Sequence, residues 1–579
     1  MLHPRAEEHE IAAQAFANIG RVRAHVGAYG RRLNTAHTTQ ELAGTLNGIA
    51  YACQARMIGP KVSIEGRIAR MMDPLWWRRN LRRELLRENE NQEHAAGHIR
   101  RRGQCYVSDF AMKRKAARAK VNRATLEALE VVNECGLALN LAEVSDKSIS
   151  NPKLRRAELM TRCRGFEETA AFMGHCGIFL TLTCPSRFHR FNAQGQENKN
   201  WTEAQIKAGQ QYLCDVWKKI RAAWNRKGFF PYGFRVAEPH HDGCPHWHIL
   251  LFVDPAQAGW FEPARLVAGR NDHGAGVVGI AGKYALQESP GEPGAIKHRF
   301  TCKRIDPKQG SATGYIAKYI AKNIDGLTEQ GEGVGLDFAS GTTAQKGAAR
   351  VRTWASIHSI RQFQQIGGPS VTVWRELRKV KTEQQNELFE GPRAAADRAL
   401  WALFWVLQGG PEAPRKALTL KPCYVESTTG KYGDAVERVW GVQALDGCAL
   451  QTKLHDWTIQ RAGLAAVDWH EAVRIDDRAV AAGAEAWVKA AGFESVSAFQ
   501  DSAAGPWTGV NNCTEDDENT GEIDDATAQW LDMMRGPGQE IRGWEGKPAP
   551  ESQDHGHIYQ SCDPASHHRG HHPPQPQRA

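Results

Sequence analysis

The chain has 579 residues, a net charge of +9, a hydrophobic fraction of 41% and 18 tryptophans. At about one domain per 150 residues, this length predicts three or four domains, and the composition excludes a chain that is disordered overall. The longest apolar stretches, such as Trp401–Leu407, are far shorter than the roughly 20 residues that cross a bilayer, and the first residues lack an apolar signal segment, so no membrane association is expected. The 13 cysteines are scattered without paired Cys-x-x-Cys spacing, which indicates reduced thiols.

Residues 1–150 are predicted to form a helical, basic N-terminal region, because segments such as Leu126–Val132 show the helical spacing of apolar residues. Between Arg67 and Arg123 this region is dense in cations, with aromatic residues such as Trp76 interleaved. That pattern is suited to a phosphate backbone with stacked bases. The alternative is a solvated helix face with ion pairs one turn apart.

Residues 151–385 are expected to form one α+β unit on a central antiparallel sheet, in which residues 179–184 and 246–253 are neighbouring strands. A helix is predicted over residues 201–226, between these two strands. The Gly-rich stretch 274–294 is expected to be a loop, and its glycine spacing is not that of a P-loop.

The segment from Glu238 to Phe252 carries the strongest chemical signal. His246 and His248 flank Trp247 on a predicted strand, so the two imidazoles share one face and the indole takes the other. An Asp-Gly turn upstream predicts a hairpin that places Glu238 opposite them, unless the register slips by one residue. Two imidazoles and one carboxylate, with open positions, suit Mg²⁺ or Mn²⁺ better than a closed zinc site. The alternative is a polar strand edge with two half-buried histidines.

A second candidate site lies on a short amphipathic helix predicted within residues 310–326. Its polar face gathers two tyrosines, each followed three residues later by a lysine: Tyr315, Lys318, Tyr319 and Lys322. Three isoleucines on the adjacent face provide enough apolar surface to dock the helix. A lysine one turn away would favour a phenolate and help to neutralise a phosphate, and an activated phenol oxygen is a workable nucleophile. The alternative is that the tyrosines only flank a buried stripe.

After about residue 386 the composition changes to Ala-rich helices with a possible strand pair near residues 418–443. Residues 386–535 are therefore interpreted as an α/β accessory region. Residues 536–579 are rich in Gly, Pro, His and Gln, which predicts a disordered tail.

Three features in chain order carry a resemblance to a known family: the strand Phe179–Thr183, then His246-Trp247-His248 with Glu238 upstream, then Tyr315-x3-Tyr319. With them the chain resembles the HUH endonuclease superfamily, and more closely the phage replication gene A protein family, over roughly residues 60–445. This resemblance implies a ferredoxin-like nickase core, a metal held by the carboxylate and the two imidazoles, and a tyrosine nucleophile.

The resemblance also implies a function. The protein would nick one strand of single-stranded origin DNA during rolling-circle replication of a phage or prophage, leave a 5′-phosphotyrosyl link and a 3′-hydroxyl primer, and later rejoin the displaced strand. A host replicative helicase is implied as a partner, and the bacterial host cytoplasm as the location. Two alternatives stay open: a relaxase or transposase with the same chemistry, and a DNA-binding protein without catalysis.

Overall fold

The computed structural model describes residues 2–29, 36–55, 58–59, 62–101, 103–259, 276–327, 331–337, 339–427 and 430–462. The predicted tail, residues 536–579, and the part of the accessory region after residue 462 lie outside these ranges. Within them the protein is a mixed α and β structure, in which helices surround four antiparallel sheets. None of the described helices combines the length and the apolar character needed to span a membrane.

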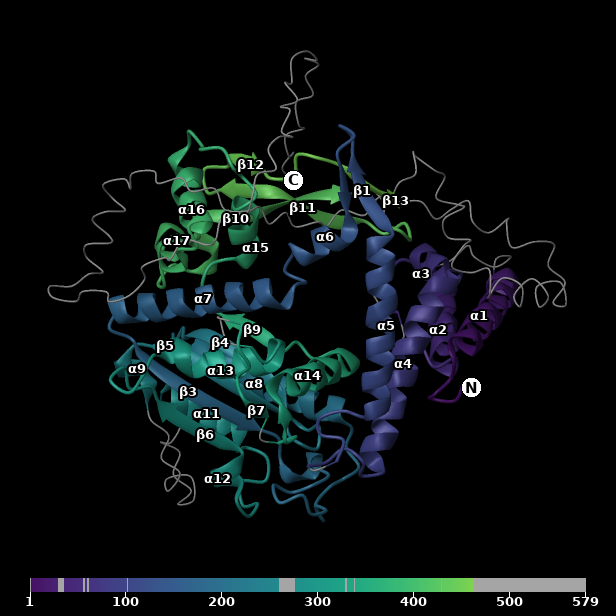
Figure 1. Cartoon of the computed structure of the whole chain (residues 1–579), viewed down its shortest axis with the longest axis horizontal. Helices are drawn as coiled ribbons and strands as arrows, with labels where there is room; N and C mark the ends of the chain where they lie inside the picture. Colours follow the sequence, from purple (N-terminus) through teal and green to yellow (C-terminus); the bar gives the residue numbers. More distant parts are fainter. Residues whose placement is uncertain are drawn as a thin grey trace.

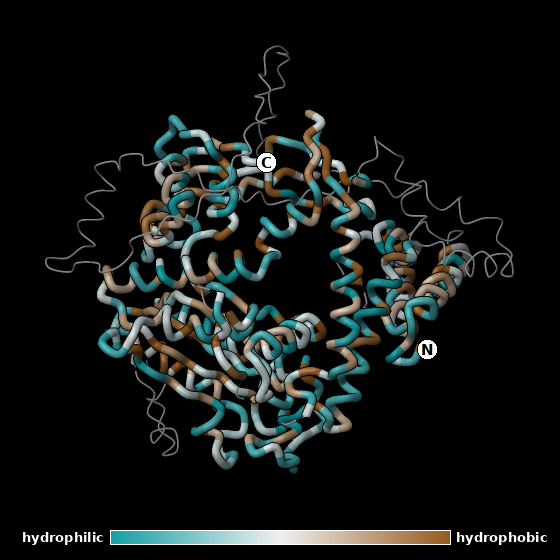
Figure 2. The backbone as a smooth tube through the Cα atoms, in the orientation of Figure 1, coloured by the Kyte–Doolittle hydropathy of each residue, from teal (hydrophilic) through white to brown (hydrophobic). Residues whose placement is uncertain are grey.

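The largest sheet has five strands in the order β6-β3-β5-β4-β9, and every neighbouring pair is antiparallel. The strands are β3 (Cys176–Thr183), β4 (Tyr232–Pro239), β5 (Pro245–Val253), β6 (Phe300–Arg304) and β9 (Phe363–Ile366). The prediction that β3 and β5 are neighbours is confirmed. In Figure 2 these strands carry hydrophobic stretches, and β5 is buried along its whole length. A strand buried on both faces requires cover on both sides of the sheet.

Helices cover both faces of this sheet (Figure 1). The core on one face includes α8 (Ile206–Arg226), α11 (Val277–Ala285) and α14 (Ala344–His358). The core on the other includes α7 (Pro152–Phe172), α13 (Ala312–Ile324), α15 (Val371–Leu377), α16 (Glu387–Asp397) and α17 (Trp401–Leu407). Since side chains alternate along a strand, Trp247 enters the first core and Leu250 the second. The side chains of His246 and His248 therefore lie on the α13 face.

The N-terminal region is helical up to residue 127 and then becomes a hairpin. Its helices are α1 (Glu8–Tyr29), α2 (Ala36–Ala52), α3 (Ile64–Met71), α4 (Pro74–Ala95) and α5 (Asp109–Glu127). The expected helix through Leu126–Val132 is wrong, because β1 (Leu129–Asn133) begins two residues after α5 ends. β1 pairs with β2 (Ala138–Asn140) and with β13 (Trp457–Arg461), so a strand distant in sequence provides the second partner. A short helix, α6 (Leu141–Asp146), follows β2.

The Gly-rich stretch 274–294 is not a loop throughout, since α11 occupies residues 277–285. Val277, Val278 and Ile280 of α11 are fully or almost fully buried, and the indole Nε1 of Trp224 in α8 donates a hydrogen bond to the Val277 carbonyl at 3.0 Å. This packing offsets the weak helix propensity of the glycines in the segment. The helix predicted from residue 201 begins five residues later, at Ile206.

The C-terminal part of the described chain packs above α7, which lies between it and the five-stranded sheet (Figure 1). The strand pair predicted near residues 418–443 is confirmed as β10 (Leu420–Ser427) and β11 (Val436–Ala444), joined by β12 (Ala449–Gln451). The remaining short elements are α9 (Pro255–Ala258), α12 (Ala295–His298), β7 (Leu336–Asp337), β8 (Thr342–Thr343) and the 3-10 turns Ser186–Phe188 and Arg415–Ala417.

Candidate active site

The β4–β5 hairpin brings one carboxylate and two imidazoles together. Glu238 pairs with His246 in the antiparallel register, as predicted, and the Gly243 φ of 84° lets the chain turn between the two strands. The Nε2 atoms of His246 and His248 are 3.0 Å apart. Oε2 of Glu238 lies 4.0 Å from the first and 3.9 Å from the second. All three residues are buried, so this is a compact internal cluster and not a strand edge.

The donor set fits a divalent cation. A separation of 3.0 Å between the two Nε2 atoms is close to that of adjacent ligands at about 2.1 Å from one ion. Burial, as the largest cause, lowers the pKa of both imidazoles, so they are neutral and offer lone pairs near pH 7. Nδ1 of His248 is 3.1 Å from Oγ1 of Thr181 in β3, which fixes the ring and leaves Nε2 as the ligand atom.

The tyrosine helix is α13, and it begins as the sequence predicts. The Ser311 side chain accepts a hydrogen bond from the backbone N–H of Gly314, which caps the helix. Glu167 of α7 accepts hydrogen bonds from the backbone N–H groups of Ala312 and Thr313, the first two residues of the helix. The apolar face of α13 is buried in the core shared with α7: Ile316, Ile320 and Ile324. Because that face is fixed, the tyrosine face is directed toward β5.

The twin phenols and the paired imidazoles converge. The Tyr319 ring lies 4.2 Å from the His248 ring, and the Tyr315 ring lies 6.0 Å from that of Tyr319, measured between centroids. Phe179 of β3 contacts both tyrosines, with centroid distances of 4.6 Å to Tyr315 and 5.3 Å to Tyr319. Both tyrosines are partly buried. One site therefore combines two phenol nucleophile candidates with a candidate metal cluster.

The two lysines of the predicted site are placed differently. Lys318 is exposed on α13. Nζ of Lys322 lies 3.4 Å from Glu238 Oε2 and 3.8 Å from Asp337 Oδ1. Burial alone would lower the Lys322 pKa, but these two carboxylates raise it above its usual value.

The expectation that a lysine favours a phenolate is not met at Tyr319. Burial, followed by the neighbouring Tyr315 and Glu238, raises the pKa of this phenol. Lys322 is instead engaged with carboxylates, which compensate its charge. In the absence of other cations, the Tyr319 phenol therefore keeps its proton at neutral pH.

Sequence reasoning missed three residues that support this site. Asn323, fully buried on α13, donates from Nδ2 to Glu238 Oε1 at 2.5 Å and to the Tyr319 carbonyl at 2.7 Å. Asp337 accepts a hydrogen bond from the buried Tyr106 hydroxyl at 2.8 Å. The position of Asn323, one turn after Tyr319, was a signal in the sequence. No signal in the sequence indicated the contact between Tyr106 and Asp337, because 231 positions separate the two residues.

Comparison with known proteins places this chain in a family. A family model described as "Bacteriophage replication gene A protein (GPA)" matches residues 23–327. The chain is 37% identical over 415 residues to the "Replication gene A protein" of Escherichia phage 186, which covers 69% of this chain and 57% of that protein. It is 36% identical to the protein of the same name in Escherichia phage P2, over 68% of this chain and 51% of that protein.

A prophage protein gives a similar result. The "Probable replication endonuclease from prophage-like region" of Escherichia coli O6:H1 is 32% identical over 471 residues, covering 78% of this chain and 53% of that protein. The chain thus spans about half the length of the curated relatives it matches. No solved structure matches it significantly. The names of these relatives describe replication proteins and probable replication endonucleases of phages and prophages. The chain belongs to the bacteriophage replication gene A protein family.

Proposed function

We propose that this protein is a metal-dependent endonuclease that starts rolling-circle replication of a phage or prophage by nicking one strand of origin DNA through a tyrosine. The observation that carries the proposal is the contact between the Tyr319 ring and the His248 ring at 4.2 Å, which joins α13 to the metal cluster of β5. A phosphodiester bound there would meet nucleophile and cation together. The prophage relatives are named as probable replication endonucleases, and these names support the same activity.

We also assign the five-stranded antiparallel sheet to the HUH nickase core. Two features support this assignment: the His-x-His strand β5 lies in the middle of the sheet, and the tyrosine helix packs on the face to which both imidazoles point. The second feature follows from strand alternation and from the isoleucine stripe of α13.

Glu238, His246 and His248 would hold Mg²⁺ or Mn²⁺. That ion, when bound, supplies Lewis-acid polarisation of the scissile phosphate and stabilises the charge that develops on it. Lys322 and Asn323 hold the carboxylate in place through Oε2 and Oε1, at 3.4 Å and 2.5 Å. These contacts orient a ligand atom.

The chemical step is a transesterification by the chain's own phenol. The tyrosine oxygen attacks phosphorus, the bond from phosphorus to the 3′ oxygen breaks, and the phenol proton ends on the released 3′ hydroxyl. The 5′ end remains linked to tyrosine, and the free 3′ hydroxyl primes synthesis. Since the link conserves the energy of the phosphodiester, the second tyrosine can later cut the regenerated origin, and the first link can be reversed to join the displaced strand without ATP.

The DNA partner is proposed on charge as well as on the site. α5 carries the cations Lys113, Arg114, Lys115, Lys120 and Arg123, and residues 116–125 of this helix are all exposed. Such a helix suits a polyanion, and its contribution would weaken with salt. We keep a host replicative helicase as the proposed source of single-stranded DNA, on the family resemblance alone.

The test uses 5′- and 3′-labelled single-stranded fragments of the genome that encodes the protein, with Mn²⁺ or Mg²⁺. We expect a covalent adduct to the 5′ end of the cut strand, resistant to denaturing detergent, and its loss in the double variant Tyr315→Phe/Tyr319→Phe. Retardation of DNA in gels without any adduct would favour a DNA-binding protein without catalysis. An adduct that persists in the double variant would refute the tyrosine assignment.

The metal is tested separately by His246→Ala. This variant should lose nicking in Mn²⁺ while it keeps the far-UV circular dichroism of the wild type. As a matched control, His25→Ala removes an exposed histidine of α1 and should leave nicking unchanged. Undiminished nicking by the wild type in excess chelator would contradict the metal role.

A further inference from the structure

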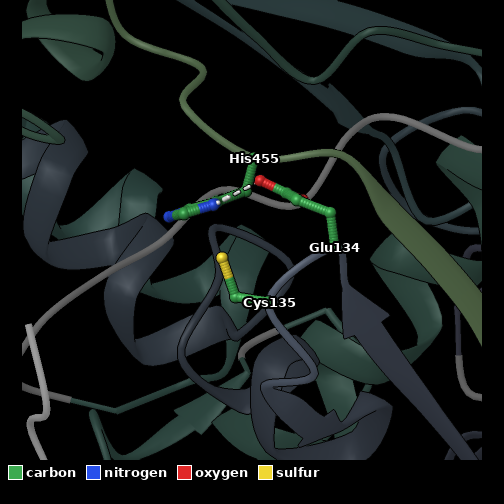
Figure 3. Close-up of side chains that lie close together, drawn as sticks. All are labelled: Glu134, Cys135 and His455. Atoms are coloured by element: carbon green, nitrogen blue, oxygen red, sulfur yellow. Dashed lines mark hydrogen bonds and ion pairs between the residues drawn. The ribbon is translucent and has the colours of Figure 1, made fainter. Parts of the chain in front are cut away.

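A second group of metal-ligating side chains lies where the N-terminal hairpin meets β13. Glu134 and Cys135 occupy the turn directly after β1, and His455 precedes β13 by two residues. Their candidate ligand atoms all lie within 4.8 Å of one another, and all three residues are exposed. Figure 3 shows the imidazole and the carboxylate facing each other with the thiol beside them. The pairing of β1 with β13 is what brings these residues together.

Hydrogen bonds hold the members of this cluster in position. Nδ1 of His455 lies 2.8 Å from Glu134 Oε1, and the backbone N–H of Asp456 donates to Oε2 of the same carboxylate at 3.0 Å. Asn133 Oδ1 accepts from the backbone N–H groups of Cys135 and Leu137, at 3.1 and 2.8 Å, which fixes the turn.

The ligand types determine which ion would fit. A thiolate, an imidazole and a carboxylate together form a borderline-soft set that is typical of Zn²⁺, whereas the set around His246 contains no sulfur. Three protein ligands leave a fourth tetrahedral position for water. Binding would displace the proton of the Cys135 thiol, and His455 would bind through Nδ1, the nitrogen that faces Glu134, with its proton on Nε2.

We propose that Glu134, Cys135 and His455 form a second divalent-metal site, selective for a thiophilic ion such as Zn²⁺, which fastens β13 to the β1–β2 hairpin. The site would close a connection between residues 321 positions apart in the chain. The competing explanation is that the exposed pair of Glu134 and His455 acts alone, and such pairs contribute little to stability. The proposal does not depend on the nickase function, since it uses no residue of that site.

The experiment titrates the full-length, reduced protein with Co²⁺ as a spectroscopic substitute and follows the near-ultraviolet charge-transfer band of a sulfur-to-cobalt bond. The metal cluster at His246 has no sulfur ligand, so it does not produce this band. We expect the band in the wild type, its loss in Cys135→Ser and a weakening of at least about tenfold in Co²⁺ affinity in His455→Ala. Cys448→Ser, which removes another exposed cysteine, is the matched control and should keep the band.

Zn²⁺ affinity, measured by competition with a chromophoric chelator, gives a second readout. Glu134→Gln keeps the size of the side chain and removes its charge, so it should weaken Zn²⁺ binding about tenfold or more. Circular dichroism should show that each variant is folded. Absence of the sulfur band in the wild type, or its persistence in Cys135→Ser, would overturn the proposal.

Discussion

The side-chain amide of Asn323 lies 2.5 Å from Oε1 of Glu238 and so connects the tyrosine helix directly to the candidate metal carboxylate. Oδ1 of the same asparagine accepts a hydrogen bond from Gln362 at 3.3 Å, next to β9. Asn323 is fully buried and Glu238 almost so. A shift of α13 would therefore move the carboxylate as well as the phenols, so the two halves of the site are positioned as one unit.

Replacing Asn323 with alanine should weaken metal-dependent nicking. Oε1 of Glu238 would lose its donor while it stays buried, which costs about 1–3 kcal/mol of the free energy of unfolding and loosens the ligand. We expect metal affinity, read from the Mn²⁺ dependence of the nicking rate, to fall about 10-fold to 100-fold. Asn225→Ala, at an exposed position in the last turn of α8, is the control and should change neither quantity. Unaltered Mn²⁺ dependence in Asn323→Ala would show that the contact does not position the carboxylate.

The two tyrosines should contribute unequally to the first cut. Tyr319 contacts the His248 ring at 4.2 Å, whereas Tyr315 contacts Phe179 and lies 6.0 Å from the Tyr319 ring. We expect Tyr319→Phe to reduce the single-turnover yield of the first covalent adduct about tenfold or more, and Tyr315→Phe to affect mainly a second transfer. Denaturing gels of labelled DNA measure both steps. The opposite ranking of the two variants would contradict the assignment of Tyr319 to the first cut.

Stability should fall on acidification because of a buried neutral histidine outside the site. Burial, and next the Arg87 guanidinium, lower the pKa of His358 in α14 to about 3, and neither ring nitrogen has a hydrogen-bond partner among the described residues. An unfolded histidine titrates near 6.5, so between these two pH values the unfolded state binds the extra proton. The free energy of unfolding then decreases as pH falls, by up to about 1.4 kcal/mol per pH unit from this group, and is unaffected above pH ~6.5.

His358→Leu should therefore flatten the acid side of the stability profile. Urea unfolding between pH 6.5 and pH ~4.5 gives the slope for the wild type and the variant. Other buried histidines, such as His240, whose pKa burial lowers to about 3, keep part of the slope. His25→Leu, at an exposed position of α1, is the control. An identical slope in His358→Leu and the wild type would show that His358 does not titrate on unfolding.

Tyr106 should matter for stability although it lies far from the reacting groups in sequence. Its hydroxyl donates to Asp337 at 2.8 Å, and the two side chains are 1% and 5% exposed. Tyr106→Phe removes a hydrogen bond to a buried charge, so the free energy of unfolding should drop by about 1.5–3 kcal/mol. Tyr51→Phe, at a residue that is 76% exposed, should change it by less than about 0.5 kcal/mol. Equal unfolding midpoints for the two variants would contradict this account.

The sequence by itself determined the local geometry of the candidate site. Alternation along β5 puts His246 and His248 on one face, and the helical period of α13 separates the tyrosines from the isoleucines. The Asp-Gly turn placed Glu238 near the two histidines, but only the structure fixed the register that pairs it with His246. Each of these relations spans fewer than about a dozen residues. The period of the backbone alone is enough to predict such short-range relations.

Only the tertiary structure decided which groups that are distant in sequence come into contact. The contacts of Asn323 with Glu238, of Tyr106 with Asp337 and of β1 with β13 join segments 85 to about 330 positions apart. Local propensity likewise predicted a loop for the Gly-rich stretch, but packing of Val277 against α8 stabilises a helix there. Contacts of this kind depend on how whole faces pack, and the energy of that packing is not encoded in any single short segment.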